Sequence, residues 1–144
     1  MIVLAIIKVK GWADTMEIGI KGSEEILVTE ALLAKNVGSG IVSVYATPMM
    51  IAGLEGTAAE SVQPYVGEGK TTVGTHIDVT HESATPAGMK VRFESELTEI
   101  SPNGKMLTFR IAAYDEKGLI GQGTHERVVI STERFEQRAQ DKLN

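Results

Sequence analysis

The sequence predicts an α+β fold in which one long helix lies against one mostly antiparallel sheet. The helix is predicted over residues 48–63, where apolar residues recur at helical spacing between Pro48 and Pro64. The sheet is predicted because four long segments of alternating apolar and polar residues fill the chain after residue 70.

The secondary structure before the helix is predicted less clearly. Residues 2–7 are apolar but too short to span a bilayer, and they are predicted as a strand or an extension. Residues 15–20 and 25–29 alternate weakly and favour a first strand. Residues 30–44 are ambiguous between a short helix and a loop.

The helix has clear boundaries and one unexpected residue. Thr47 suits the N-cap and Pro48 the first helical position. Glu55 falls on the face that is expected to be buried, so it points into the core or a cleft, where an ionised carboxylate needs partners. That face carries Ile51, Glu55, Ala58 and Val62. No Lys or Arg lies between residues 36 and 69, so no local ion pair is expected.

Glycines inside two of the predicted elements indicate close neighbours. Gly53 and Gly56 lower helix propensity by about 1 kcal/mol each relative to alanine, which suggests that a sheet backbone or a ligand packs there. Gly121 and Gly123 in the last strand favour close backbone packing.

The predicted strands cover residues 71–81, 89–100, 106–115 and 119–131. Short, turn-rich connections join the last three, so these should form an antiparallel meander. Alternation predicts an inward set and an outward set. The inward set is Val91, Phe93, Leu97, Leu107, Phe109 and Ile111, and the outward set is Arg92, Glu94, Glu96, Thr108 and Arg110.

Composition limits the classes of function. The 144 residues are expected to form a single domain, with a core at about residues 15–135. A net charge of -5 without a basic run argues against nucleic acid. With no cysteine, the chain has no disulfide or thiolate chemistry, which suits a cytoplasmic location, and no membrane span is predicted.

Strand alternation distinguishes two of the three histidines. His81 shares the apolar face of its strand with Ile77 and Val79, whereas His76 lies on the polar face. His81 could be a core histidine that bonds a backbone carbonyl. Alternatively, His81 with Glu55 would provide a base and a partner for activating water or a relayed nucleophile. Thr47 could cap the helix, assist this chemistry, or do both.

Other candidate sites are weaker. His76 and His81 lie on opposite strand faces and cannot chelate one ion, so no metal site is predicted. Residues 67–71 resemble part of a phosphate-binding loop, but Pro64 stands where that motif needs glycine, and a turn into a strand is predicted instead. Residues 125–127, His-Glu-Arg, could form an exposed ionic patch or reach a ligand, and the exposed patch is favoured.

The set formed by Thr47, Glu55, Gly74 and His81 resembles that of the fluoroacetyl-CoA thioesterase family of hotdog-fold proteins. Residues 79–88 and 120–127 are also similar to that family, and the similarity runs from about residue 45 to residue 135. Residues 36–45 lack the phenylalanine-bearing lid of the fluoroacetyl enzyme, so selectivity for fluoroacetyl-CoA is not predicted.

The resemblance implies a hotdog fold, with a curved antiparallel sheet wrapped around a long central helix. It also implies a homodimer whose sheets join and whose active sites lie near the interface. The implied catalytic residues are Thr47, Glu55 and His81, and Gly74 would line the acyl pocket. Arg127 is a further candidate substrate contact. The expected partner is an acyl-CoA, and no metal or other cofactor is expected.

Three functions remain open. The leading hypothesis is hydrolysis of a small acyl-CoA thioester by Thr47, Glu55 and His81, with direct attack by water and a covalent route both open. The alternative is a module that binds acyl-CoA without turning it over. Hydration of an enoyl thioester fits less well, because no second acid–base set is found.

Overall fold

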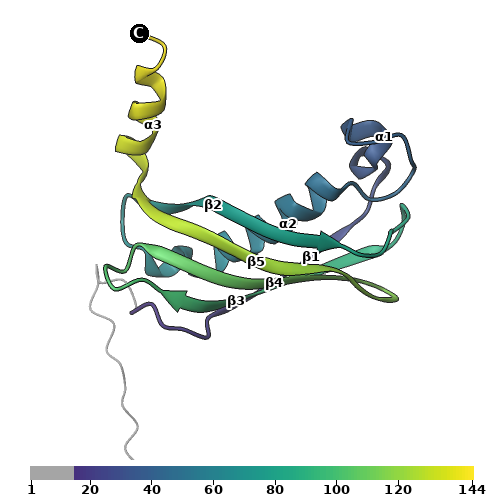
Figure 1. The fold of residues 1–144 in the computed structure, drawn as a ribbon, viewed down its shortest axis with the longest axis horizontal. Helices are drawn as coiled ribbons and strands as arrows, with labels where there is room; N and C mark the ends of the chain where they lie inside the picture. The colour runs from purple at the N-terminus through teal and green to yellow at the C-terminus, as the bar shows by residue number, and fades with distance from the viewer. Residues whose placement is uncertain (1–14) are drawn as a thin grey trace, which may run out of the picture.

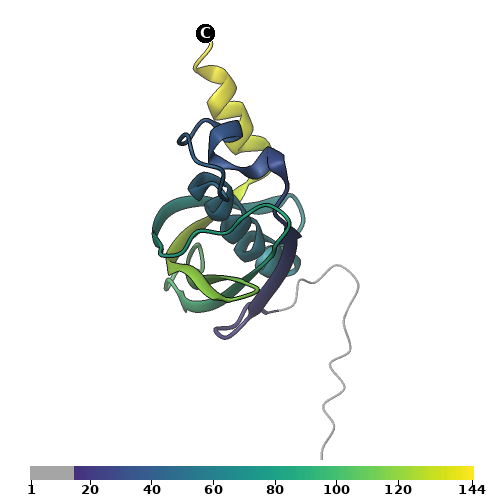
Figure 2. The same ribbon diagram turned by 90° about the vertical axis from the view of Figure 1, so that its right-hand side faces the viewer.

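A computed structural model describes residues 15–144 and shows one curved sheet with a helix across its inner face. Helix α2 spans Thr47–Val62. The strands are β1 Lys21–Leu27, β2 Lys70–His81, β3 Lys90–Ile100, β4 Met106–Asp115 and β5 Gly118–Ser131. Seen end-on in Figure 2, the sheet curls around α2. The predicted strand at residues 2–7 lies outside the described residues.

The strands follow the order β1-β3-β4-β5-β2, and every neighbouring pair is antiparallel. The predicted meander is therefore confirmed as β3, β4 and β5. Strands β1 and β2 form the two edges of the sheet. Of the two weak segments predicted as a first strand, residues 25–29 overlap β1, whereas residues 15–20 lie before it and include a turn at residues 18 and 19, so that part of the prediction was wrong.

The ambiguous stretch before α2 contains a 3-10 helix, η1 Glu30–Leu32, and a one-turn helix, α1 Ala34–Val37. Gly38 ends α1 with a φ of 91°, a left-handed conformation that glycine adopts without strain. A second 3-10 helix, η2 Gln63–Tyr65, continues α2 through Pro64. Helix α3, Thr132–Asp141, was not predicted; it has no buried residue and projects away from the sheet (Figure 1).

The core lies between α2 and the sheet. The six inward strand residues from Val91 to Ile111 that alternation predicted are all buried. On α2 the buried face carries Met50, Leu54, Thr57, Ala58 and Val62, so it is rotated from the predicted stripe. Glu55 consequently lies at the border of the buried face, and its side chain is 40% exposed.

The two glycines in α2 differ in the space around them. A Cβ on Gly53 would collide with the ring of Phe93, so Gly53 does have the close neighbour that was expected, although that neighbour is a side chain. A Cβ on Gly56 would have no heavy atom within 4 Å. Gly121 and Gly123 are confirmed as close-packing positions, because a Cβ on either would collide with the backbone of β2.

No helix among the described residues has the length and apolar character needed to cross a bilayer.

Candidate active site

Two groups of polar side chains lie where α2 meets strands β2 and β5. We call Thr47 and His81 the helix-start pair. We call Glu55, Thr72, His125 and Arg127 the arginine network. Thr47 and Glu55 are eight residues apart on α2, which is about 12 Å along a helix that rises ~1.5 Å per residue.

The helix-start pair joins α2 to the end of β2. Thr47 Oγ1 lies 2.7 Å from His81 Nδ1. Ala46, rather than Thr47, occupies the N-cap, and no side chain caps the helix. The prediction that Thr47 is the N-cap was therefore wrong by one position: Thr47 is the first helical residue, Pro48 is the second, and the Thr47 hydroxyl bonds His81.

A cavity of about 280 Å³ opens beside this pair. Its walls come from the segment before α2, from the start of α2 and from the residues that follow β2. They are Ala34, Ser39, Gly40, Val42, Val44, Tyr45, Thr47, His81, Glu82, Ser83 and Ala84. The first turn of α2 carries no acidic residue, so the positive end of the helix dipole at this wall is not neutralised from within the helix.

Burial lowers the pKa of His81, and the nearby backbone of Ser83 opposes that shift. The imidazole is therefore mainly neutral near pH 7 and can accept a proton. The Nε2 atom of His81 is buried, and no group among the described residues lies in position to form a hydrogen bond with it. The face prediction is confirmed for both histidines, because His81 is half-buried and His76 is exposed.

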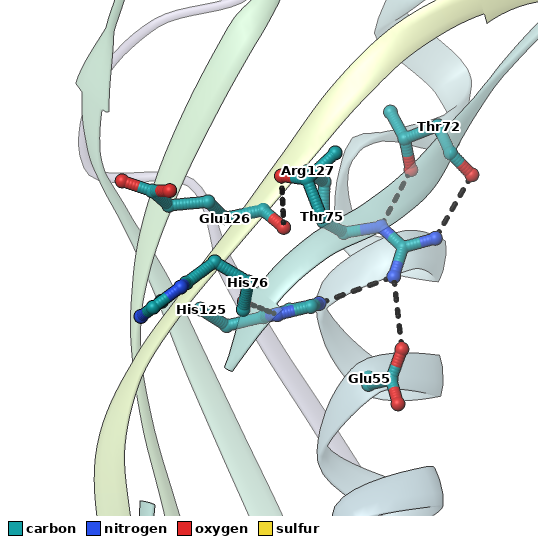
Figure 3. Close-up of polar contacts among 7 residues, drawn as sticks. All are labelled: Glu55, Thr72, Thr75, His76, His125, Glu126 and Arg127. Carbon is teal, nitrogen blue, oxygen red and sulfur yellow. Dashed lines mark hydrogen bonds and ion pairs between the residues drawn. The ribbon is translucent and has the colours of Figure 1, made fainter. Parts of the chain in front are cut away.

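The arginine network is centred on the buried guanidinium of Arg127, a residue that is only 7% exposed (Figure 3). Its Nε donates to Thr72 Oγ1 at 2.7 Å, and its Nη2 donates to the Thr72 carbonyl at 2.8 Å. Its Nη1 lies 3.1 Å from His125 Nε2 and 3.8 Å from Glu55 Oε2. His125 Nδ1 is in turn 2.7 Å from the carbonyl of His76.

Gly74 provides the space in which Glu55 and Arg127 meet. A Cβ at Gly74 would lie 2.8 Å from Glu55 Oε2, 3.1 Å from His125 Cε1 and 3.4 Å from Arg127 Nη1. A side chain there would force the carboxylate to move. The small residue at this position therefore allows the carboxylate to approach the arginine.

A β-bulge at Thr75 places Gly74 and His81 on the same face of β2. The register with β5 pairs Gly74 with Arg127 and then His76 with Glu126, so Thr75 has no partner. Its hydroxyl donates to the Glu126 carbonyl at 3.2 Å. In a regular strand, residues 74 and 81 would point to opposite faces, and the extra residue corrects this.

The structure bears out one expectation about these residues, that Glu55 has no ion-pair partner in neighbouring sequence, and corrects two others. Glu55 does have an ionic partner, Arg127, which comes from β5 rather than from neighbouring sequence. Residues 125–127 are not an exposed patch, because His125 is 1% and Arg127 7% exposed. Glu55 has no hydrogen bond or ion pair to Thr47 or His81 within residues 15–144, because two helical turns separate it from the helix start.

His125 is a functional candidate that the sequence patterns predicted only as part of an exposed patch. Alternation in β5 places it on the same face as Arg127, and this signal was available in the sequence. Within residues 15–144, no group of three or more His, Asp or Glu side chains is arranged to hold a metal ion.

Solved structures of similar shape define the class of protein. A thioesterase superfamily member from Thermus thermophilus has 26% identity and a TM-score of 0.79, covering 88% of this chain and 95% of that chain. A structure of the fluoroacetyl-CoA thioesterase has 31% identity and a TM-score of 0.84, covering 90% of this chain and 98% of that chain. The fold is that of the hotdog thioesterase superfamily.

The chain belongs to the fluoroacetyl-CoA-specific thioesterase family, whose family model matches residues 28–133. The fluoroacetyl-CoA thioesterase of Streptantibioticus cattleyicolor is 38% identical over 99 residues, which are 69% of this chain and 70% of that protein. A threonine-to-serine variant of the fluoroacetyl enzyme has been solved in complex with acetyl-CoA.

Proposed function

We propose that this chain hydrolyses a small acyl-CoA thioester to the free acid and CoA. The observation that carries the proposal is the 2.7 Å contact between Thr47 Oγ1 and His81 Nδ1 at the positive start of α2. Family membership supports the same reaction, since the relative from Streptantibioticus cattleyicolor is a thioesterase.

In the proposed reaction the thioester carbonyl lies at the start of α2, where the helix dipole stabilises negative charge on its oxygen. If Thr47 donates its proton to Nδ1 of His81, the Thr47 oxygen can attack the carbonyl and form an acyl-enzyme that water then hydrolyses. If Nδ1 instead donates to Thr47, Nε2 can take a proton from water, which attacks directly. In both routes the C–S bond breaks and the sulfur leaves as the thiol of CoA.

Glu55 provides a second acid–base group in this proposal. Its carboxylate is partly solvent-exposed and faces Arg127, so it is able to accept a proton from the attacking water and then to pass that proton to the leaving sulfur. Gly74 would line the acyl pocket beside this carboxylate, and Arg127 would form its polar wall. The small cavity at Thr47, with walls of Gly, Ala, Ser and Val together with larger side chains, favours a short acyl group.

A panel of acyl-CoAs of increasing chain length, assayed for free thiol, tests the proposal. Release of CoA from at least one short acyl-CoA, with many turnovers per chain, is expected. The second candidate is an acyl-CoA-binding module without turnover. Tight acyl-CoA binding without thiol release across the whole panel would favour this second candidate and overturn the first.

We also propose a homodimer in which the site combines two chains. Strand β2 is a 12-residue edge strand that, within residues 15–144, pairs only with β5, and such edges readily pair with another strand. Antiparallel pairing of two β2 strands would bring Glu55 of the partner subunit towards the Thr47–His81 pair. This arrangement would explain why Glu55 is about two turns away from that pair within one chain.

Mixing two inactive variants tests the shared site. Glu55→Gln and His81→Ala chains would be dissociated, mixed in equal amounts and allowed to reassociate. A shared site predicts recovery of about a quarter of the wild-type rate, because half of the dimers have one intact site of two. No recovery, with heterodimers shown to form, would place each site within one chain.

The proposal treats the chain as one domain with its core in residues 15–135. It also places the protein in the cytoplasm, where its CoA thioester substrate would be found.

A further inference from the structure

We propose that His125 is a positioning residue for Glu55: its imidazole holds the guanidinium of Arg127, which in turn holds the Glu55 carboxylate. The inference rests on the proposed thioesterase function, in which Glu55 is the acid–base group. It assigns a role to a buried histidine that no part of the mechanism above uses.

The hydrogen-bond partners of His125 allow only one protonation state. The carbonyl of His76 can only accept, so Nδ1 of His125, 2.7 Å away, must carry a proton. The guanidinium of Arg127 can only donate, so Nε2 of His125, 3.1 Å away, must be bare. The imidazole is therefore neutral, with its proton on Nδ1.

Arg127 is held at each of its three nitrogens. Nε and Nη2 both bond Thr72, and Nη1 bonds His125. The second N–H of Nη1 remains for Glu55, whose Oε2 is 3.8 Å away. His125 is the partner that orients the nitrogen nearest the carboxylate, because the two bonds to Thr72 engage the other two nitrogens.

Glu55 needs such an anchor because little else holds it. Its side chain is 40% exposed, and its only ion pair within the described residues is the one to Arg127. A free glutamate samples several rotamers, and fixing it opposes side-chain entropy. The Arg127 charge behind the carboxylate and the open space at Gly74 together favour one position.

Acid would disrupt this arrangement in a defined way. Burial and the adjacent Arg127 lower the pKa of His125, whereas the His76 carbonyl, Glu55 and Glu126 oppose that shift. The neighbouring strand β4 contributes the apolar ring of Phe109, whose centroid lies 6.3 Å from that of the His125 ring. Protonation of Nε2 would replace the bond to Arg127 with repulsion between two cations.

Two variants separate the two bonds of His125. His125→Asn keeps a donor near the Nδ1 position for the His76 carbonyl but loses the acceptor for Arg127. His125→Gln keeps an acceptor near the Nε2 position for Arg127. We expect His125→Asn to lower kcat about tenfold or more with KM within about twofold, and His125→Gln to stay within about threefold of wild type.

A cycle with Glu55→Gln distinguishes positioning from a general structural role. If His125 acts through Glu55, adding His125→Asn to Glu55→Gln should change kcat by less than about twofold. Wild-type kcat for His125→Asn, or the same fold-loss in both backgrounds, would overturn the inference. The proposed function fails separately, if the wild-type chain releases no thiol.

A spectroscopic measurement on the wild-type protein does not depend on whether the variants fold. Nitrogen-15 NMR of the imidazoles at pH 7 should show His125 as neutral, with its proton on Nδ1. A proton on Nε2, or a doubly protonated ring, would overturn the inference whatever the kinetics show.

Discussion

The two polar groups along α2 are built in opposite ways. The helix-start pair has one 2.7 Å contact between an exposed threonine and a half-buried histidine, next to a cavity of about 280 Å³. The arginine network has four hydrogen bonds around a buried arginine and a buried histidine, with a single half-exposed carboxylate at its border.

The difference indicates that the two groups have different roles, one in proton transfer and one in holding a charge in place. A single bond leaves Thr47 and His81 free to exchange protons with a substrate or with water. The fully bonded network holds a charge in place and has only one group, Glu55, that solvent can reach. We infer that the reacting groups are Thr47 and His81 in the helix-start pair, together with Glu55 at the exposed border of the arginine network.

Removing the hydroxyl of Thr47 should have a large effect, comparable to the loss of His81 or Glu55. In Thr47→Val, the nitrogen Nδ1 of His81 loses its partner, and kcat is expected to fall about a hundredfold. Thr47→Ser keeps the hydroxyl and should stay within about tenfold of wild type. Steady-state thiol release gives both values, and equal activity of the valine and serine variants would contradict the role of the hydroxyl.

A methyl group at Gly74 should have the next largest effect. In Gly74→Ala, the new Cβ would lie 2.8 Å from Glu55 Oε2, so the carboxylate must move, and kcat should fall about tenfold. Gly56→Ala provides a control in α2, where a Cβ has open space. Turnover of Gly74→Ala at the wild-type rate would show that the position of Glu55 does not matter.

Acid should reduce the stability of the fold. The pKa values of His81 and His125 are lowered from 6.5 in the fold, chiefly by burial. Below pH 6.5 the unfolded chain therefore binds protons before the folded chain does, and the free energy of unfolding falls as the pH falls further. Above pH 6.5 both histidines are mainly neutral in both states, and this loss is absent.

Urea denaturation at pH 7 and at pH 5 measures this loss of stability. The His125→Gln variant removes one of the two titrating groups and should show a smaller difference between the two pH values. An equal difference in wild type and variant would show that His125 does not contribute to the pH dependence.

The smallest effects should come from the two glycines inside α2. Gly56→Ala should raise the free energy of unfolding by about 1 kcal/mol, because it improves helix propensity without a clash. Gly53→Ala should lower it by about 1–3 kcal/mol, because its Cβ would collide with the ring of Phe93. Urea denaturation of both variants checks the opposite signs.

Much of the fold could be predicted from sequence because its patterns are local. Alternation identified the buried faces of β3 and β4, and the turn-rich connections identified their antiparallel order. The buried face of α2 was predicted with a rotational error, because Met50 and Leu54 fit a helical stripe as well as Ile51 and Val62 do. Helix α3 has no buried residue, and its mostly polar sequence offers only Phe135 and Ala139 at helical spacing, which is too little to predict a helix that packs on the core.

The candidate site was only partly predictable, because its partners come from distant strands. Thr47 and His81 were selected from an N-terminal helix signal and a strand face, and they do meet. The partnership of Glu55 with Arg127 depends on the pairing of β2 with β5 and on the bulge at Thr75. A pairing between strands so far apart in the chain, with an extra residue in one of them, is not specified by the local pattern of either strand.

Hydrolysis of acyl-CoA thioesters by this chain is expected to depend on both His81 and Glu55. The most direct test compares thiol release by His81→Ala and Glu55→Gln with an exposed control on the same helix as Glu55, Glu60→Gln in α2. We expect a loss of at least about a hundredfold in each site variant and the wild-type rate in the control. Wild-type turnover by either folded site variant would overturn the proposed mechanism.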